Sequence, residues 1–196
     1  MKRKLVLVAS PPACGKTFVS ELLANLLEPC AYLDKDDLAP LLRRSFELQG
    51  QELNMDGAFY LKNLHSAEYE TILRIALSAL RFENTVILNA PFCREVRDCD
   101  YMRRLKERVN AYNADLILIW VVAPVEICYK RMKQRNSDRD ALKLENWNAY
   151  IKTVDYSAPL TLKKENAVDT LIVFDTTNDE TTQTALLRTL KIIKGA

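Results

Sequence analysis

The sequence predicts an α/β fold in which a parallel sheet is covered by helices on both faces. Short apolar runs alternate with helix-like stretches along the whole chain. The run from 115 to 122 is apolar at successive positions, as in a parallel strand that is buried on both faces. No repeat, low-complexity tract or linker divides the 196 residues. We therefore expect one three-layer, doubly wound domain over 1–196.

The expected strands are short apolar runs bounded by polar or turn-forming residues. Five segments fit this description: 5–8, 31–33, 85–88, 115–122 and 170–174. Together they predict a five-stranded parallel sheet.

The expected helices lie between these runs. They cover about 16–27, 37–47, 57–81, 94–110, 124–135 and 179–195. In the third of them, apolar residues such as Leu61, Leu64 and Ile72 recur at helical spacing and predict one buried stripe. Pro124 suits the first turn of its helix. The segment 136–166 is polar and lacks a long apolar pattern, which predicts a mobile segment with a short helix.

Composition and sequence pattern argue against several classes of protein. Lys and Arg total 28 against 26 Asp and Glu, so the basic excess of a protein that coats nucleic acid is missing. No apolar run approaches the roughly 20 residues that span a bilayer, and the run 5–8 is too short for a signal peptide. The five cysteines are widely spaced and form no C-x-x-C pair, so we expect neither a disulfide framework nor a zinc site. A reducing cytoplasm is the simplest setting.

A phosphate-binding loop (P-loop) is predicted between the first strand and the first helix. Its residues are Ser10, Pro11, Pro12, Ala13, Cys14, Gly15, Lys16 and Thr17. In such loops the backbone N–H groups surround the phosphates, the lysine reaches the β- and γ-phosphates, and the Ser/Thr hydroxyl binds Mg²⁺. The first glycine of the usual pattern is replaced by Ser10. The prediction of a P-loop therefore depends mainly on the place of this segment, directly after the first strand. Cys14 lies at a helix N-terminus, where the pKa of a thiol can fall, and we expect it to be sensitive to thiol modification.

With this loop, an acidic cluster and later arginines in view, the chain resembles the P-loop kinases of small molecules and nucleic-acid ends. That group of ATP-binding, AAA-type proteins includes shikimate and gluconate kinases, chloramphenicol phosphotransferase, zeta toxins and polynucleotide 5′-kinases. Their loop commonly reads G-x-P-G-S-G-K-[ST]; Pro12 matches its proline, while Ser10 and Ala13 replace two glycines. The resemblance implies ATP and Mg²⁺ as cofactors, with Thr17 as metal ligand, and a hydroxyl group as acceptor.

The acidic cluster Asp34-Lys35-Asp36-Asp37 follows the second strand. It resembles the N-R-D-D segment of polynucleotide kinases, in which the first aspartate of the pair acts as base; that residue corresponds to Asp36. A carboxylate suits this role because it can orient and deprotonate a hydroxyl during phosphoryl transfer. Asp37 is a second candidate for acceptor binding, or the cap of the next helix. The alternative is that the whole cluster forms only a turn.

Arg131 and Arg135 are four residues apart and share one helix face. In the resembled kinases, arginines at this place belong to a lid that closes over the phosphates, so we expect a lid over about 131–160. Both side chains would neutralise charge on the transferring group, and Arg131 would also touch the nucleotide. Arg139 could join them. The alternative is that basic residues favour helix C-termini through the helix dipole.

Asn89 ends the third strand, where several P-loop proteins carry a magnesium-associated aspartate. Its amide cannot supply that charge, so either the metal relies on Thr17, water and a carboxylate after the second strand, or metal use differs. Phe92 and Arg94 follow closely. Because ligands bind at the carboxyl ends of parallel strands, both are candidates for acceptor contact.

These observations predict transfer of the γ-phosphoryl group from ATP to a hydroxyl on a small molecule, with no membrane partner. One alternative is a polynucleotide 5′-hydroxyl kinase. It draws on Asp36, Asp37 and four basic residues of one helix: Arg103, Arg104, Lys106 and Arg108. The other is an ATP-binding regulator without transfer activity, favoured by the replaced loop glycines and the missing aspartate at Asn89.

Overall fold

The computed structural model describes residues 2–195, without the side chains at 138, 139 and 142. Its centre is a five-stranded sheet in the order β2-β3-β1-β4-β5, and every neighbouring pair is parallel. The strands are β1 (Arg3–Ala9), β2 (Ala31–Asp34), β3 (Thr85–Asn89), β4 (Ala114–Val122) and β5 (Thr170–Asp175). The predicted five-stranded parallel sheet is therefore confirmed.

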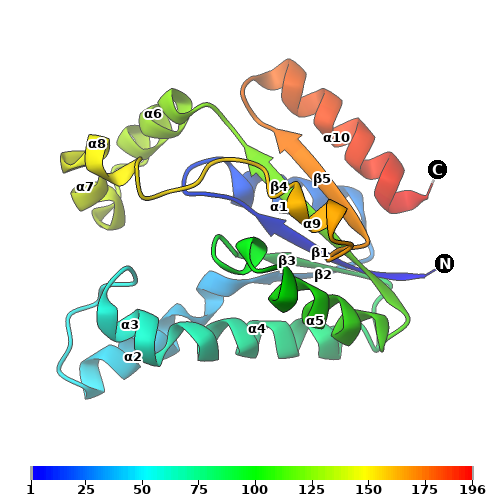
Figure 1. Ribbon diagram of the computed structural model, residues 1–196, viewed down its shortest axis with the longest axis horizontal. Coiled ribbons are helices and arrows are strands. Elements are labelled where there is room, and N and C mark those ends of the chain that lie inside the picture. Colours follow the sequence, from blue (N-terminus) through cyan, green and yellow to red (C-terminus); the bar gives the residue numbers. More distant parts are fainter. Residues whose placement is uncertain (1, 196) are drawn as a thin grey trace.

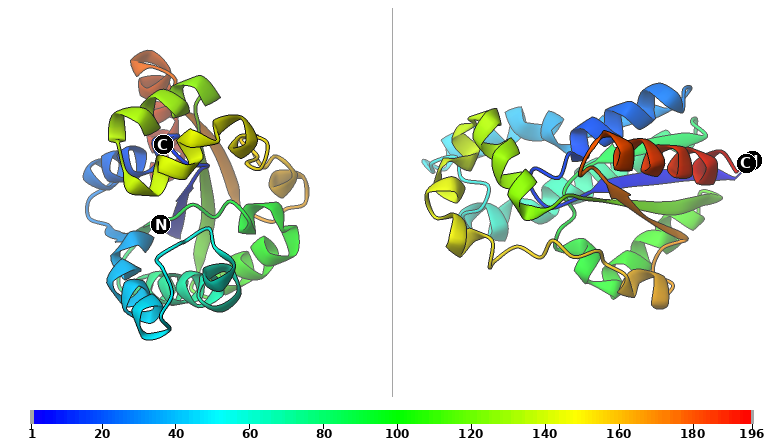
Figure 2. Two further views of the ribbon diagram at one scale, coloured as in Figure 1. Left: turned by 90° about the vertical axis from the view of Figure 1, so that its left-hand side faces the viewer. Right: turned by 90° about the horizontal axis from the view of Figure 1, so that it is seen from above.

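Helices cover both faces of the sheet, as predicted (Figures 1 and 2). They are α1 (Lys16–Leu26), α2 (Ala39–Leu48), α3 (Ala58–Asn63), α4 (His65–Ala79), α5 (Cys99–Asn110), α6 (Val125–Arg135), α7 (Asp138–Glu145), α8 (Trp147–Tyr150), α9 (Thr161–Lys164) and α10 (Asp179–Lys194), with the 3₁₀ helices η1 (Lys35–Leu38) and η2 (Glu95–Arg97). Helices α4 and α5 pack on one face, and α1 and α10 on the other.

Strand β1 shows why the sheet needs two layers of helices. Leu5 and Leu7 lie in the core on the α4–α5 side, whereas Val6 and Val8 lie in the core on the α1–α10 side. All four are fully buried, and each such side chain contributes about 1.5–3 kcal/mol through the hydrophobic effect. β1 lies between β3 and β4, where the chain order reverses direction, and ligands of doubly wound sheets bind beyond the strand ends at this point.

Two predicted helices are divided in the structure. The helix expected over 57–81 breaks at Leu64 (φ −118°) because α3 packs on α2 through Phe46 and Tyr60, while α4 continues along the sheet. The helix expected from 94 begins as η2 and restarts after Asp98. That residue is extended, and its carboxylate accepts hydrogen bonds from the backbone N–H groups of the next helical turn, at 2.9 Å each.

The polar segment 136–166 contains more helix than predicted. The short helices α7 and α8 pack against α6, with the rings of Tyr129 and Trp147 4.9 Å apart (Figure 1). Helix α9 packs against α5 instead. The chain between α8 and α9 is held by Arg97, whose guanidinium donates to the carbonyl oxygens of Ser157 (2.6 Å) and Asp155 (3.2 Å).

Between residues 2 and 195, the helices are all too short or too polar to cross a membrane.

Candidate active site

The loop between β1 and α1 has the backbone of a phosphate cradle. Gly15 adopts φ +95° and Ala13 adopts φ +64°. A left-handed backbone conformation costs an L-residue about 1–2 kcal/mol. Ala13 is therefore strained, whereas a glycine at this position would not be. The chain nevertheless follows the turn. Ala13 therefore lowers the stability of the loop but does not prevent the turn.

Lys16 and Thr17 begin α1 and meet a polar cluster at the ends of β2 and β3. The Lys16 Nζ donates to Asn89 Oδ1 at 2.5 Å. The Asn89 Nδ2 donates to Asp34 Oδ2 at 2.6 Å and lies 3.4 Å from the Thr17 hydroxyl. Asp34 and Asn89 are direct partners in the pairing of β2 with β3. The strand register thus connects a carboxylate, through Asn89, to the lysine and the hydroxyl of the P-loop.

Asp34 also sets the position of Asp36. Its Oδ1 accepts the backbone N–H of Asp36 at 2.9 Å and so caps η1. The Tyr32 hydroxyl lies 3.5 Å from the other carboxylate oxygen. Asp37 was predicted to cap the next helix, and that prediction is wrong, because Asp37 lies within η1 and α2 begins after Leu38 without a side-chain cap. Asp36 and Asp37 are both exposed on the same turn.

A buried ion pair supports this turn from below. The Lys35 Nζ lies 2.7 Å from Glu68 Oε1 and 3.3 Å from Asp36 Oδ1. Lys35 is 6% exposed and Glu68 4%. The second oxygen of Glu68 accepts the Tyr60 hydroxyl from α3. Since a buried charge is tolerated only with partners, these contacts fix η1, and with it Asp36, against α3 and α4.

Arg131 approaches the P-loop from α6. Its guanidinium donates to the Thr176 hydroxyl (3.1 Å) and carbonyl (2.6 Å) and lies 3.5 Å from the Ala13 carbonyl oxygen. The Thr176 hydroxyl in turn donates to the Cys14 carbonyl at 2.6 Å. Sequence reasoning missed Thr176. It follows directly on β5, so its place at the carboxyl end of a strand was the one available signal.

A family model described as an AAA domain matches residues 5–156, which is most of the chain. The chain belongs to this AAA domain family. No curated protein sequence matches it.

Solved structures share the fold of this AAA domain over nearly its whole length. A protein from Chloroflexus aurantiacus that is proposed to be a kinase is 20% identical, with 97% of this chain and 98% of that chain covered and a TM-score of 0.66. Shikimate kinase from Acinetobacter baumannii, solved with shikimate, is 18% identical, with 98% and 94% covered and a TM-score of 0.53. Kti12 from Chaetomium thermophilum, solved with ADP–AlF₃, is 16% identical, with 96% and 98% covered and a TM-score of 0.56. The P-loop kinase fold predicted from the sequence is thus confirmed.

Arg135, the second arginine predicted to act at the phosphates, has a partner within the segment that is predicted to form a lid. Its Nε and Nη2 donate to Asp140 Oδ2 at 2.8 and 2.5 Å, and Asp140 is 1% exposed. This pair joins α6 to α7. A direct role of Arg135 at the phosphates stays a prediction, and the side chain of Arg139 lies outside the described ones.

The two residues predicted to contact the acceptor after β3 lie in different environments. Phe92 is fully buried and packs edge-on against Tyr69, with ring centroids 5.1 Å apart. Its ring is not exposed to a ligand, so contact with the acceptor is not supported, and we do not include it in the proposed site. Arg94 is exposed. It lies close enough to His65 for its charge to lower the pKa of that imidazole further, beyond the larger effect of burial.

Glu95, next to Arg94, carries a polar atom without a partner. Its Oε1 lies 3.7 Å from His65 Nε2, while Oε2 has no hydrogen bond within the part of the chain that is described. Burial raises the pKa of Glu95. The carboxyl group is therefore a source of instability when it is ionised.

Cys14 differs from the expectation for a thiol at a helix N-terminus. It is 1% exposed, and its Sγ lies 3.6 Å from the Sγ of Cys128 on α6. The contact with Cys128 and burial raise the pKa of the Cys14 thiol. The expected lowering was wrong because the thiol points into the core, away from the N–H groups that would stabilise a thiolate.

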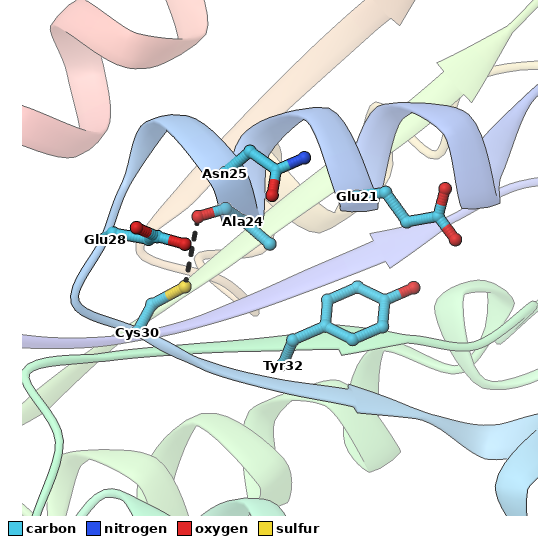
Figure 3. A pocket seen from close by; sticks show the side chains of 6 residues that line it. All are labelled: Glu21, Ala24, Asn25, Glu28, Cys30 and Tyr32. Atoms are coloured by element: carbon cyan, nitrogen blue, oxygen red, sulfur yellow. Dashed lines mark hydrogen bonds between the residues drawn. The ribbon is translucent and has the colours of Figure 1, made fainter.

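A cavity of about 370 Å³ lies beside α1 and the edge strand β2, away from the P-loop (Figure 3). It is lined by Glu21, Ala24, Asn25, Glu28, Cys30 and Tyr32. Two carboxylates among six lining residues disfavour a triphosphate. This lining does not suit a nucleotide, and binding of the phosphates at the P-loop stays a prediction.

The groups that could hold a metal ion are the Thr17 hydroxyl, the Asp34 carboxylate and the Asn89 amide, which form one hydrogen-bonded cluster. Within residues 2–195, no three His, Cys, Asp or Glu side chains are placed to bind a metal ion together. This donor set does not form a closed protein site. It fits Mg²⁺, which keeps several waters and takes ligands from phosphates.

Proposed function

We propose that this protein is an ATP-dependent kinase that transfers the γ-phosphoryl group to a hydroxyl on a small molecule. The observation that supports this most is the cluster at the carboxyl ends of β2 and β3, where Asn89 joins Lys16 and Thr17 to the Asp34 carboxylate. The other oxygen of Asp34 holds the backbone of Asp36 beside this cluster. Phosphoryl transfer needs a phosphate clamp and a group that orients the attacking hydroxyl, and both are available here.

Each residue has a separate task in the proposed reaction. The loop amides and Lys16 hold the phosphates and neutralise charge on the leaving ADP. As the acceptor oxygen bonds to the γ-phosphorus and the bond to the β,γ-bridging oxygen breaks, Asp36 takes the hydroxyl proton. Mg²⁺, when bound, would supply further positive charge to the reacting phosphates. Thr17 would hold it directly, with Asp34 as the nearby carboxylate.

The acceptor would lie against the exposed side of η1. Asp36 and Asp37 are exposed there, and Arg94 is exposed after β3. Shikimate kinase, one of the similar folds, was solved with shikimate, which makes small polyhydroxy compounds the first class of acceptor to test. An arginine beside the site favours acceptors that also carry an anionic group.

A lid over about 131–160 is part of the proposal. Arg131 and Thr176 link α6 to the P-loop. On the other flank, the Lys143 Nζ of α7 lies 3.0 Å from the Asp56 carboxylate in the connection between α2 and α3. Contacts on both flanks suit a segment that excludes water during transfer.

The polynucleotide 5′-kinase alternative loses much of its support. Three of the four basic residues of α5 on which it drew have acidic partners: Arg108 binds Glu70 at 2.8 Å, Lys106 lies 3.2 Å from Asp169, and Arg103 pairs with Asp100. Paired charges contribute little to the release of counterions that drives nucleic-acid binding.

The alternative of a regulator without transfer activity rested on the replaced loop glycines, at Ser10 and Ala13, and on the aspartate missing at Asn89. Ala13 takes the left-handed backbone that a glycine would take, and Asp34 supplies a carboxylate beside Asn89. The chemistry that the sequence alone did not show is thus available from neighbouring positions.

The five free thiols also suit a reducing compartment such as the cytoplasm.

The test is a screen with ATP labelled in the γ-phosphate against small hydroxyl metabolites, nucleosides and oligonucleotides. We expect label to move to a small hydroxyl compound. Transfer to oligonucleotides, with binding that weakens steeply as salt rises, would favour the polynucleotide alternative. ATP binding without transfer to any acceptor would favour the regulator.

A further inference from the structure

Two of the five cysteines lie against each other beside the P-loop. The Sγ atoms of Cys14, in the loop, and Cys128, on α6, are 3.6 Å apart. They are 114 positions apart in the chain and at most 1% exposed. In the part of the chain that the structure describes, no other thiols are in contact with each other: Cys30 faces the Ala24 carbonyl and Cys93 the Ser10 carbonyl.

The surroundings make the two sulfurs unequal. The hydrogen bond with Cys14 lowers the pKa of Cys128, and the charge of Arg131 adds to this effect. The same contact and burial raise the pKa of Cys14. Because Arg131 follows Cys128 by one turn of α6, we take Cys128 as the nucleophile and Cys14 as the thiol that completes the disulfide.

We propose that Cys14 and Cys128 form a redox modification site, at which a small peroxide converts the two thiols into a disulfide that ties the P-loop to α6. The alternative is a purely structural role, in which both cysteines serve as small apolar residues of the core, as buried cysteines commonly do. Two features favour the redox site: the sulfurs face each other, and the charged Arg131 guanidinium follows one turn after Cys128.

The chemistry has two balanced steps. The Cys128 thiolate attacks one oxygen of hydrogen peroxide, the O–O bond breaks, and the released hydroxide takes a proton to become water. The Cys14 sulfur then attacks the sulfenic sulfur, its proton leaves with the departing hydroxyl as a second water, and the S–S bond forms. The sulfurs must approach from 3.6 Å to about 2.05 Å, which requires the loop or α6 to move. The same movement must admit peroxide, because both thiols are buried.

A disulfide here would act on the loop that holds the phosphates. The Cys14 carbonyl is already held by Thr176, so a bond from its side chain to α6 would fix this residue on two sides. The loop could then no longer adjust its N–H groups around a nucleotide. Loss of one charge-assisted hydrogen bond corresponds to a loss of about tenfold in affinity. This consequence rests on the proposed nucleotide site, whereas formation of the disulfide does not.

The test is peptide mapping of the full chain after oxidation. The protein is treated with hydrogen peroxide, alkylated and cut with trypsin, which separates Cys14 in peptide 5–16 from Cys128 in peptide 109–130. We expect these two peptides to appear joined, and to separate when dithiothreitol is added before alkylation. Cys30→Ser, a matched change outside the pair, should leave the joined peptides unchanged. Recovery of Cys14 and Cys128 as separately alkylated or separately oxidised peptides would overturn the proposal.

Nucleotide affinity is then measured on the same samples. We expect oxidation to weaken binding of ATP by wild type and by Cys30→Ser by about tenfold, reversibly, and to leave Cys128→Ser or Cys128→Ala unaffected. Joined peptides with unchanged affinity would refute the regulatory consequence. If the reduced protein binds no ATP at all, the proposed function fails, but the peptide map still decides the redox site.

Discussion

Replacement of Lys35 by methionine tests whether the buried ion pair beneath η1 holds the acceptor side of the site together. Methionine keeps much of the aliphatic stem and removes the charge. Glu68 would then remain 4% exposed, with the Tyr60 hydroxyl as its remaining partner from this cluster. Breaking a buried ion pair in this way typically costs 3–5 kcal/mol. The other partner of Lys35 is Asp36, whose side chain is 63% exposed, so the Lys35–Asp36 pair contributes little to stability. We therefore expect Lys35→Met to lower the free energy of unfolding by about 3 kcal/mol.

Urea unfolding of the wild type and Lys35→Met measures this loss as a difference in the free energy of unfolding. For a chain of this length it corresponds to a fall in Tm of roughly 6–12 °C. The matched control is Arg44→Met, which breaks the exposed pair of Arg44 with Glu47 (3.0 Å) and should cost less than about 1 kcal/mol.

The double variant Lys35→Met/Glu68→Gln completes the test. Glutamine removes the uncompensated charge and still accepts the Tyr60 hydroxyl, so the double variant should recover most of the lost stability. The reasoning is refuted if Lys35→Met costs no more than Arg44→Met, or if the double variant is less stable than Lys35→Met alone.

Three further predictions concern the loop, the base and the unpaired carboxyl group. Lys16→Ala should weaken ATP binding, whereas Asp36→Asn should bind ATP normally and lose transfer, as calorimetry and a labelled-ATP assay would show; normal turnover of Asp36→Asn excludes it as the base. Ala13→Gly removes the left-handed strain but raises the conformational entropy of the unfolded chain, so the variant's stability should stay within about 1 kcal/mol of wild type. A weaker affinity of this variant for ATP would contradict the loop geometry. Burial raises the pKa of Glu95 in the folded protein above its value in the unfolded chain. The contribution of this carboxyl group to stability therefore falls as the pH rises from the unfolded pKa through the folded one. Glu95→Gln should therefore gain stability relative to wild type at pH 7 and little at pH 4; an equal gain at both would count against this.

The sheet could be predicted from the sequence because its signal is local. Each strand is a short apolar run between turn residues, and the burial of β1 on both faces follows from such a run. The divided helices were missed for a different reason. The break at Leu64 depends on α3 packing against α2, and the restart after Asp98 depends on a cap that competes with the helical pattern.

The candidate site was predictable in its parts but not in its connections. Motif position correctly placed the loop after β1 and Asp36 after β2, while their functions stay predictions. The role of Asp34 needed the register that pairs it with Asn89, and the contact of Cys14 with Cys128 joins residues 114 positions apart. Such long-range pairings are set by how the sheet and α6 pack, which one sequence does not specify residue by residue.

Binding of ATP and transfer of its γ-phosphate, measured side by side for the wild type and Asp36→Asn with the best acceptor of the screen, test the central proposal most directly. We expect both proteins to bind ATP with similar affinity and only the wild type to label the acceptor. A wild type that binds no ATP, or an Asp36→Asn variant that labels the acceptor at the normal rate, would contradict it.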